Sequence, residues 1–180
     1  MPAVSIIVAA LEAEATLGAA LAGALAQSFG DFEIVIAPDE PRDYAGFGAL
    51  DPRSRILPGV PAPTGPGPAR NRALAAARGD WIALLDADDR WSPNYLGDLV
   101  PAARSHGAAF GRTSVLDETG AELRSIPAPG YRGPANYAVF ARAFGSFHGL
   151  ARRTPERRWH PVFAEDVLFV RGDWGKAHLD

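Results

Sequence analysis

Three aspartates, Asp86, Asp88 and Asp89, lie within four residues of one another, directly after the apolar run Trp81–Leu85. Carboxylates this close repel one another unless a cation neutralises them. Mg²⁺ and Mn²⁺ favour oxygen ligands from one or two carboxylates together with substrate phosphates. The cluster therefore indicates a metal that holds a diphosphate. An ordinary acidic turn before a helix that begins at Pro93 is the alternative.

The elements that must position these carboxylates are strands of a parallel sheet. Trp81–Leu85 predicts a central strand buried on both faces, and Val4–Ala9 is another short apolar run. Phe32–Ala37 predicts a further strand, introduced by the turn residues Gly30 and Asp31 and closed by Pro38. Ligands of open α/β sheets bind at the carboxyl ends of the strands. Asp39 and Glu40 follow Phe32–Ala37, so they fall at the carboxyl end of that strand.

Helices are expected between and after these strands. Thr16–Gln27 has leucines at a spacing of four, which gives a helix one buried stripe. Ala69–Arg78 is rich in alanine, a strong helix former, and Pro93–Ser105 carries its leucines and a valine on one side. Pro58–Pro68 contains five prolines and three glycines, which predicts an irregular loop near the ligand. Ser54–Leu57 is short enough to be a minor strand.

The last third is expected to add antiparallel strands and a helix. Ala108–Leu116 and Ala121–Ile126 predict a β-hairpin, and Phe147–Ala151 predicts a strand. Ala135–Phe144 is compatible with a helix, and the apolar residues of Phe163–Trp174 share one face of a further helix. A basic loop before that helix contains Arg152, Arg153, Arg157 and Arg158. The predicted fold class is α/β, with a mostly parallel sheet flanked by helices and with added antiparallel strands.

Composition limits the class of protein. The 180 residues suit one α/β domain, and we expect no second domain. The net charge of −3, from 18 basic and 21 acidic residues, lacks the basic surface that general nucleic-acid binding requires. Cysteine is absent, which excludes disulfides, zinc–thiolate sites and thiol catalysis. No apolar run approaches the ~20 residues of a transmembrane segment, so we expect a cytoplasmic protein, with peripheral membrane attachment left open.

Six short motifs, in their order and spacing, resemble the family-2 glycosyltransferases, the inverting enzymes of GT-A fold that use nucleotide-diphospho-sugars. The motifs are Ser5–Val8, Ala26–Phe29, Asp31–Ile36, Ala69–Leu74, Leu85–Asp89 and Phe163–Asp166. The fifth resembles the DxD element of the family, and the sixth resembles its Glu-Asp motif. The resemblance covers nearly the whole chain and implies a single GT-A-like, Rossmann-like domain over residues 1–180.

The resemblance also implies a role for each candidate residue. It makes Asp166 the catalytic base that deprotonates the acceptor hydroxyl. It gives Mn²⁺ or Mg²⁺ binding to Asp88, with His178 as a further candidate ligand. The implied substrate-binding residues are Ala9, Asp39, Arg70, Asp86, Ala87 and Glu165. In this set Asp39 would contact the base, Arg70 the base or the diphosphate, and Asp86 the ribose.

The donor implied by the resemblance is a nucleotide-diphospho-sugar, and we expect a UDP-sugar. The expected setting is glycan or surface polysaccharide synthesis. The sequence identifies neither the acceptor nor the oligomeric state, so a homo-oligomer stays open.

Two departures from the family pattern leave alternatives open. The Pro-Thr-Tyr-Asn that usually follows the first strand is Ala9–Glu12 here, without an aromatic contact to the base, and the usual Asp-Asp-Gly-Ser is Pro38–Pro41. A degenerate sugar-nucleotide-binding domain without activity is therefore one alternative. A nucleotidyltransferase is another, although Ala9–Ala15 lacks the glycines and basic residues that such enzymes usually place there. Glu165 and Asp166 also suit the first turn of an ordinary helix.

Overall fold

The computed structural model describes residues 1–49, 51–106, 108–117 and 119–126, and the strands at 149–152, 158–159 and 168–169. The largest element is a six-stranded sheet with the strand order β3-β2-β1-β4-β8-β5. Its strands are β1 (Val4–Ala10), β2 (Phe32–Pro38), β3 (Ser54–Ile56), β4 (Trp81–Leu84), β5 (Ala108–Phe110) and β8 (Gly149–Arg152).

β1 lies inside the sheet and is parallel to both of its neighbours. Val4 is opposite Phe32 of β2 on one side and opposite Trp81 of β4 on the other. β3 is parallel to β2, whereas β8 is antiparallel to β4 and to β5. The predicted adjacency of three parallel strands is confirmed, and so is the α/β class with antiparallel additions.

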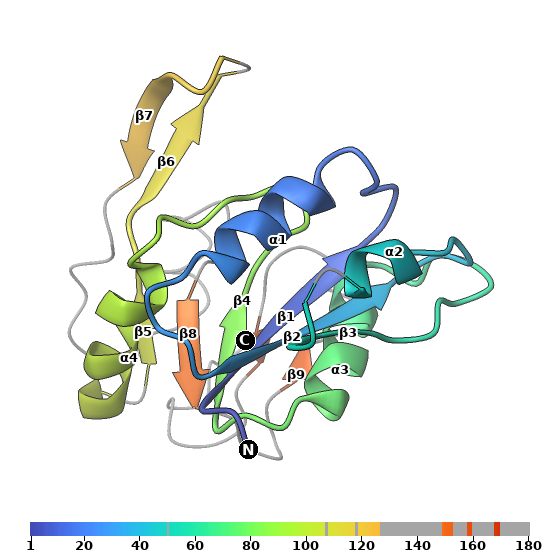
Figure 1. Cartoon of the computed structure of the whole chain (residues 1–180), viewed down its shortest axis with the longest axis horizontal. Coiled ribbons are helices and arrows are strands. Elements are labelled where there is room, and N and C mark those ends of the chain that lie inside the picture. The colour runs from blue at the N-terminus through green and yellow to red at the C-terminus, as the bar shows by residue number, and fades with distance from the viewer. Residues whose placement is uncertain are drawn as a thin grey trace, which may run out of the picture.

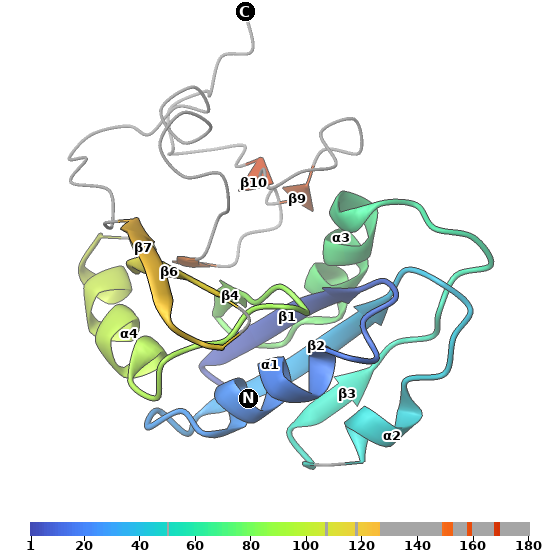
Figure 2. The same cartoon turned by 90° about the horizontal axis from the view of Figure 1, so that it is seen from above.

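Helices cover both faces of this sheet (Figures 1 and 2). The helices are α1 (Leu17–Leu25), α2 (Ala45–Gly48), α3 (Pro66–Ala76) and α4 (Tyr95–His106). Because side chains alternate along a strand, Ile6 and Val8 of β1 join the core beneath α1 and α4, while Ile7 joins the core beneath α3. β1 is therefore buried on both faces, as its continuous apolar sequence predicts.

The helix boundaries differ from the sequence prediction in several places. The sequence places a helix at Ala69–Arg78 and a loop at Pro58–Pro68, but α3 begins inside that loop, at Pro66. Proline suits the first helical turn, because its fixed φ is helical and its missing N–H would lack a partner there anyway. α1 is shorter than predicted, and α4 begins at Tyr95 rather than at Pro93. The one-turn helix α2 was missed, because its glycines carry no helical pattern.

The predicted hairpin exists but does not join the main sheet. β6 (Thr113–Leu116) and β7 (Glu122–Ile126) form a separate antiparallel pair, which projects from the rest of the described chain in Figure 1. The predicted single strand Ala108–Leu116 is broken at Gly111, where a Cβ atom would lie 2.8 Å from Cε2 of Tyr95. Glycine is therefore the residue that fits beside this ring, between β5 and β6. β5 and β8, instead of the hairpin, extend the main sheet.

The predicted helix at Phe163–Trp174 is wrong where the structure describes it. Leu168–Phe169 forms strand β10, which pairs antiparallel with β9 (Arg158–Trp159). The residues around β10 are β-branched and aromatic, and such a short apolar run suits a strand as well as a helix. Pairing with β9 shows that Leu168–Phe169 is a strand and not part of a helix.

The other predictions for the last third of the chain agree in part with the structure. The strand predicted at Phe147–Ala151 is β8, which begins two residues later and ends at Arg152. Arg152 and Arg158 lie in β8 and β9, so the predicted basic loop is wrong at both residues. The helix predicted at Ala135–Phe144 lies outside the described residues.

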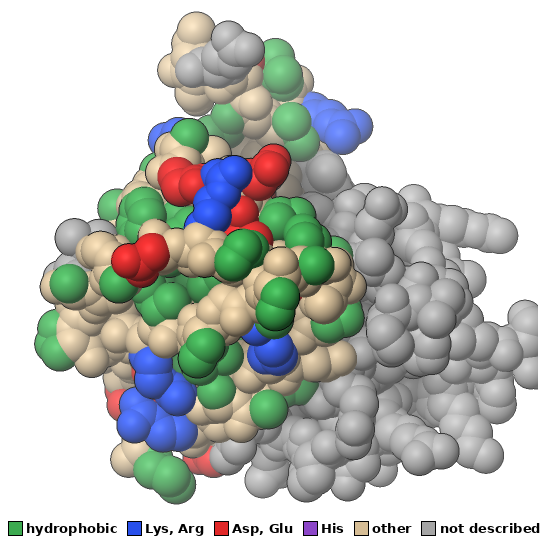
Figure 3. All heavy atoms as spheres, turned by 90° about the vertical axis from the view of Figure 1, so that its right-hand side faces the viewer, with side chains coloured by type: hydrophobic (Ala, Val, Ile, Leu, Met, Phe, Trp, Pro, Cys, Tyr) green, Lys and Arg blue, Asp and Glu red, His purple; other side chains and the backbone are tan. Residues whose placement is uncertain are grey.

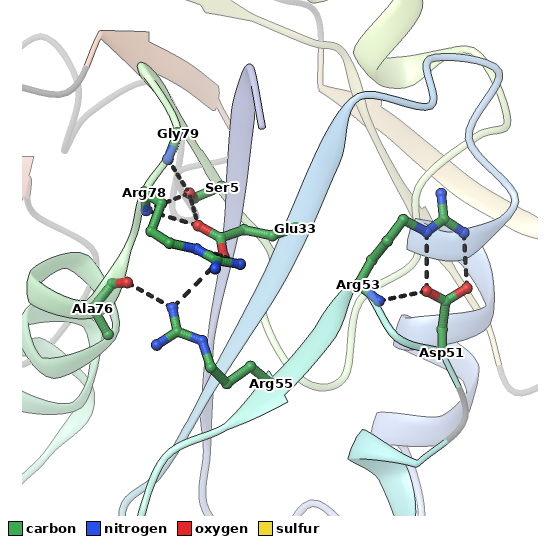
Figure 4. A network of polar contacts seen from close by, with 8 residues as sticks. All are labelled: Ser5, Glu33, Asp51, Arg53, Arg55, Ala76, Arg78 and Gly79. Atoms are coloured by element: carbon green, nitrogen blue, oxygen red, sulfur yellow. Dashed lines mark hydrogen bonds and ion pairs between the residues drawn. The ribbon is translucent and has the colours of Figure 1, made fainter. Parts of the chain in front are cut away.

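A buried carboxylate, Glu33 of β2, joins the amino ends of the strands (Figure 4). Ser5 Oγ and the backbone N–H of Arg78 each donate to Glu33 Oε1 at 2.7 Å. Arg78 Nε donates to Oε2 at 2.9 Å, and Arg55 Nη2 lies 3.6 Å from the same oxygen. Burial raises the pKa of Glu33, but hydrogen bonds from Ser5 and Arg78 outweigh it and hold the pKa below its ordinary value.

The helices of the described part of the chain are short. α4 has 12 residues, whereas a transmembrane helix needs about 20. Among the described residues, no helix has both the length and the apolar character needed to cross a bilayer.

Candidate functional site

The carboxyl ends of β1, β2 and β4 meet at one edge of the sheet, opposite the Glu33 network. Ala10 at the end of β1 is opposite Pro38 at the end of β2, and the backbone N–H of Asp39 donates to the Ala10 carbonyl at 2.7 Å. β4 pairs with β1 as far as Leu84, and the aspartate cluster follows directly. The structure thus brings the acids after β2 and β4 to the edge where open α/β sheets bind ligands.

Asp39 is almost fully buried, with 2% of its surface exposed. Both carboxylate oxygens accept hydrogen bonds from the loop that leads into α3. Thr64 Oγ1 donates to Oδ1 at 2.6 Å, and the backbone N–H groups of Thr64 and Gly65 donate to Oδ2 at 2.8 and 2.7 Å. The carboxylate that the sequence assigns to the nucleotide base is therefore bound to the protein's own loop.

The first part of this loop is fixed to the end of β2 by two further contacts. Arg72 donates through Nη1 to the carbonyl of Pro58 at 3.1 Å and through Nη2 to the carbonyl of Pro38. Gly59 approaches so closely that a Cβ atom there would lie 2.2 Å from the carbonyl oxygen of Glu40. Only glycine fits at this distance, so the loop predicted as irregular is attached at defined points.

Arg70 and Asp86 form an ion pair between α3 and the end of β4. Arg70 Nη2 lies 2.7 Å from Asp86 Oδ1. The arginine side chain is buried, while 27% of the aspartate side chain is exposed. Charge-assisted hydrogen bonds of this kind are stronger than neutral ones, and the pair fixes a guanidinium and a carboxylate side by side at the predicted site.

The other residues of the aspartate cluster have different surroundings. Asp88 is exposed, while Ala87 and Asp89 are half-buried. The N–H of Asp89 donates to the Asp86 carbonyl at 3.1 Å, which closes a turn. Within the described ranges, no three acidic or histidine side chains are grouped closely enough to hold a metal ion. The cluster fits a metal that takes one or two carboxylates and completes its coordination with phosphate oxygens.

An ionic cluster at the same edge was not predicted from the sequence. Arg42 Nε lies 2.8 Å from Glu40 Oε2, Nη1 bonds to Glu14, and Nη2 is 3.9 Å from Glu12 Oε1. Figure 3 shows a face on which acidic and basic side chains gather side by side. The hydrogen bond from Arg42 lowers the pKa of Glu14. Glu12 and Glu14 follow the first strand, whereas Glu40 and Arg42 follow the second, so the pairing between the two loops became visible only with the sheet.

Glu40 connects the loop after β1 to the segment after β2. Tyr44 Oη donates to Glu40 Oε1 at 2.7 Å and accepts from the N–H of Ala13 at 3.0 Å. The N–H of Glu12 also donates to Glu40. Burial and the hydrogen bond to Glu40 raise the pKa of Tyr44 to about 12, so the phenol keeps its proton at neutral pH. Glu12 has a φ of 49°, a conformation uncommon outside glycine, and this network holds it.

Of the remaining predicted site residues, the structure describes only Ala9. Ala9 is half-buried in β1, opposite Ala37, one residue before the end of the strand. Glu165, Asp166 and His178 lie outside the described residues. The assignments of the base and of the second metal ligand stay predictions.

Comparison with known proteins shows that this chain is similar to glycosyltransferases. The family profile described as Glycosyl transferase family 2 matches residues 5–151. The succinoglycan biosynthesis protein ExoO of Rhizobium meliloti is 37% identical over 129 residues, which cover 69% of this chain and 37% of that protein. The glucosyltransferase WfgD of Escherichia coli, named UDP-Glc:alpha-D-GlcNAc-diphosphoundecaprenol beta-1,3-glucosyltransferase, is 38% identical over 110 residues, 59% of this chain and 43% of that protein.

A longer match is the putative glycosyltransferase EpsH of Bacillus subtilis, which is 31% identical over 178 residues, 93% of this chain and 48% of that protein. The chain therefore spans less than half of the length of each of these three relatives.

Solved structures share the fold. The S. aureus TarS 1-349 structure in complex with UDP-GlcNAc has a TM-score of 0.64 at 19% identity, covering 83% of this chain and 45% of that one. The mannosyltransferase PcManGT from Pyrobaculum calidifontis, in complex with GDP-Man and Mn²⁺, has a TM-score of 0.54 at 20% identity, covering 64% and 36%. At these identities the likeness concerns the fold, which is that of the GT-A glycosyltransferases.

Proposed function

Because this chain belongs to glycosyl transferase family 2, we propose that it transfers a sugar from a nucleotide-diphospho-sugar to an acceptor hydroxyl, with inversion at the anomeric carbon. The observation that carries the proposal is the Arg70–Asp86 ion pair at the sheet edge where Asp39 also lies. Ligands of open α/β sheets bind at this edge. The proposal treats residues 1–180 as one GT-A-like domain.

The described residues supply the donor-binding groups of this proposal. Arg70 binds the base or the diphosphate, because its planar guanidinium offers several N–H donors in a fixed geometry. Asp86 approaches the ribose, and Asp39 the base. Ala9 and Ala87 are small, half-buried residues beside the strand ends, so they leave room for the nucleotide.

We propose a UDP-sugar as the donor. The name of WfgD includes UDP-Glc, and the TarS structure holds UDP-GlcNAc, whereas PcManGT holds GDP-Man. The name of ExoO supports a setting in polysaccharide synthesis. Because the acceptor in the name of WfgD is linked to undecaprenol, a lipid, we also propose a cytoplasmic enzyme that works at the membrane surface.

A divalent cation fits beside Asp88. This carboxylate is exposed, next to the half-buried Asp86 and Ala87, and Mg²⁺ or Mn²⁺ can be bound by one or two carboxylates together with substrate phosphates. When bound, Mn²⁺ or Mg²⁺ supplies positive charge to the diphosphate leaving group. We propose Asp88 as its main ligand and His178 as a second.

In the proposed reaction, Asp166 takes the proton of the acceptor hydroxyl while the oxygen attacks the anomeric carbon of the sugar. The bond between that carbon and the diphosphate oxygen breaks, and the nucleoside diphosphate leaves with the electron pair. A single displacement of this kind inverts the anomeric centre. The guanidinium of Arg70 stabilises the charge that develops on the leaving group. Glu165 contributes to substrate binding.

Ligand-dependent stabilisation tests this proposal. The full chain is heated with UDP, GDP, CDP and UDP-sugars, each with and without Mn²⁺, because a ligand that binds only the folded state raises its Tm. We expect stabilisation by a UDP ligand and slow release of UDP from one UDP-sugar. No stabilisation by any nucleotide contradicts the proposal. Binding without sugar release or transfer favours the degenerate binding domain instead.

A further inference from the structure

We propose that Thr64 and Gly65 compete with the nucleotide base for Asp39, so that the base binds only when these two residues release the carboxylate. The inference rests on the proposed function and adds an internal regulator of donor affinity to the same site. It concerns the segment 61–65, between the fixed start of the loop and the start of α3.

Asp39 has little acceptor capacity left. An ionised carboxylate has about four acceptor positions. Three donors from Thr64 and Gly65, at 2.6–2.8 Å, occupy three of them. The residue is also only 2% exposed, so an N–H group of a ligand cannot reach the carboxylate while the segment stays in place.

The competing segment is built to move without disturbing the rest of the site. Residues 61–64 are exposed and belong to no helix or strand. The start of the loop is held separately, by Arg72 on Pro58 and by Gly59 against Glu40. Gly65 has a φ of 98°, which glycine adopts and leaves without steric cost. The proposed movement therefore involves the segment 61–65, which lies between the attached start of the loop and α3.

Release costs hydrogen bonds on Asp39, and new partners offset only part of this cost. Once Thr64 and Gly65 no longer donate to Asp39, their N–H and O–H groups can form hydrogen bonds with water. A donor of the base then binds Asp39 in their place. The ring N–H of uracil can replace one of these three bonds, so Asp39 keeps fewer donors after the exchange than before it. The exchange therefore lowers the affinity for any base that binds Asp39, since a buried carboxylate with fewer partners is unfavourable.

The matched variants Thr64→Val and Thr64→Ser of the full chain test this competition. Valine keeps the shape and the backbone N–H but lacks the hydroxyl donor, so Thr64→Val should bind UDP roughly 3- to 10-fold more tightly by calorimetry. Thr64→Ser keeps the donor and should stay within about 2-fold of the wild type. If Thr64→Val binds UDP equally or more weakly, Thr64 is a fixed anchor and the proposal is wrong.

Amide hydrogen exchange of the wild-type protein gives a second readout that does not depend on any variant. A merely structural role predicts that UDP slows or leaves unchanged the exchange of the Thr64 and Gly65 amides. Competition predicts that saturating UDP accelerates both, because each amide loses its acceptor. If the wild type binds no nucleotide, the proposed function itself fails. If it binds UDP but these amides do not exchange faster, only the competition is refuted.

Discussion

Arg70 Nη2 lies 2.7 Å from Asp86 Oδ1, which links α3 to the end of β4 across the carboxyl edge of the sheet. The two residues are 16 positions apart. The arginine side chain has 8% of its surface exposed and the aspartate side chain 27%, so the pair presents its carboxylate partly to solvent and keeps its guanidinium inside. This ion pair therefore connects α3 to β4 and also orients Asp86, the residue predicted to bind the ribose.

Replacing Arg70 should affect binding and stability together. Arg70→Ala leaves Asp86 without its charged partner and removes the donor proposed for the base or diphosphate. We expect UDP affinity to fall at least about 10-fold and the free energy of unfolding to fall by about 1–3 kcal/mol. Calorimetry with UDP and urea denaturation measure the two effects. Arg104→Ala, an exposed arginine of α4, is the matched control and should change neither quantity.

Metal-dependent nucleotide binding should depend on Asp88. In the wild type, Mn²⁺ should raise the affinity for UDP, because phosphate oxygens and Asp88 share its coordination. Asp88→Asn keeps the size of the side chain, removes its charge, and should abolish this increase while leaving metal-free binding nearly intact. Asp80→Asn, an exposed aspartate at the amino end of β4, is the control. An unchanged effect of Mn²⁺ in Asp88→Asn counts decisively against this ligand.

The hydrogen bonds of Glu33 should make the free energy of unfolding depend on pH. The pKa of Glu33 is lower in the folded chain than its ordinary value of 4.5, so its contribution is fully present above that value and is lost as pH falls through the folded pKa. Glu33→Gln should cost about 1–3 kcal/mol near neutral pH. Urea denaturation of both proteins should show this difference shrinking below about pH 4.5. A difference that stays constant in acid would contradict the role of the charged carboxylate.

The sequence predicted the centre of the fold, because β1, β2 and β4 are mainly apolar, with Ser5 and Glu33 as the polar residues of β1 and β2, and a strand covered on both faces buries such a run. It failed where short segments fit two structures. Ala108–Leu116 is broken at Gly111, which packs closely against Tyr95, and Leu168–Phe169 pairs as a strand instead of continuing a helix. Neither contact can be read from local periodicity.

The site was predictable in position but not in its hydrogen bonds. Asp39 and Asp86 follow strands that the sequence identified, so the edge on which they lie could be predicted. The partner of Asp39 is Thr64, 25 residues away, in a proline-rich loop without periodicity. The pairing of Arg42 with Glu12 and Glu14 likewise depends on two loops that meet only in the folded sheet.

The predicted base, Asp166, adjoins a second acid, Glu165, and the two can be separated by mutation. Asp166→Asn keeps the size of the side chain and removes the proton acceptor, so kcat should fall by roughly 10²-fold or more while UDP-sugar binding stays nearly intact. Glu165→Gln should have the milder effect and should act mainly on KM, in keeping with a role in substrate binding. Initial rates of transfer and calorimetric affinities for the same UDP-sugar distinguish these outcomes. Near-normal transfer by Asp166→Asn together with an inactive Glu165→Gln would reverse the two roles, and full activity in both variants would refute the proposed mechanism.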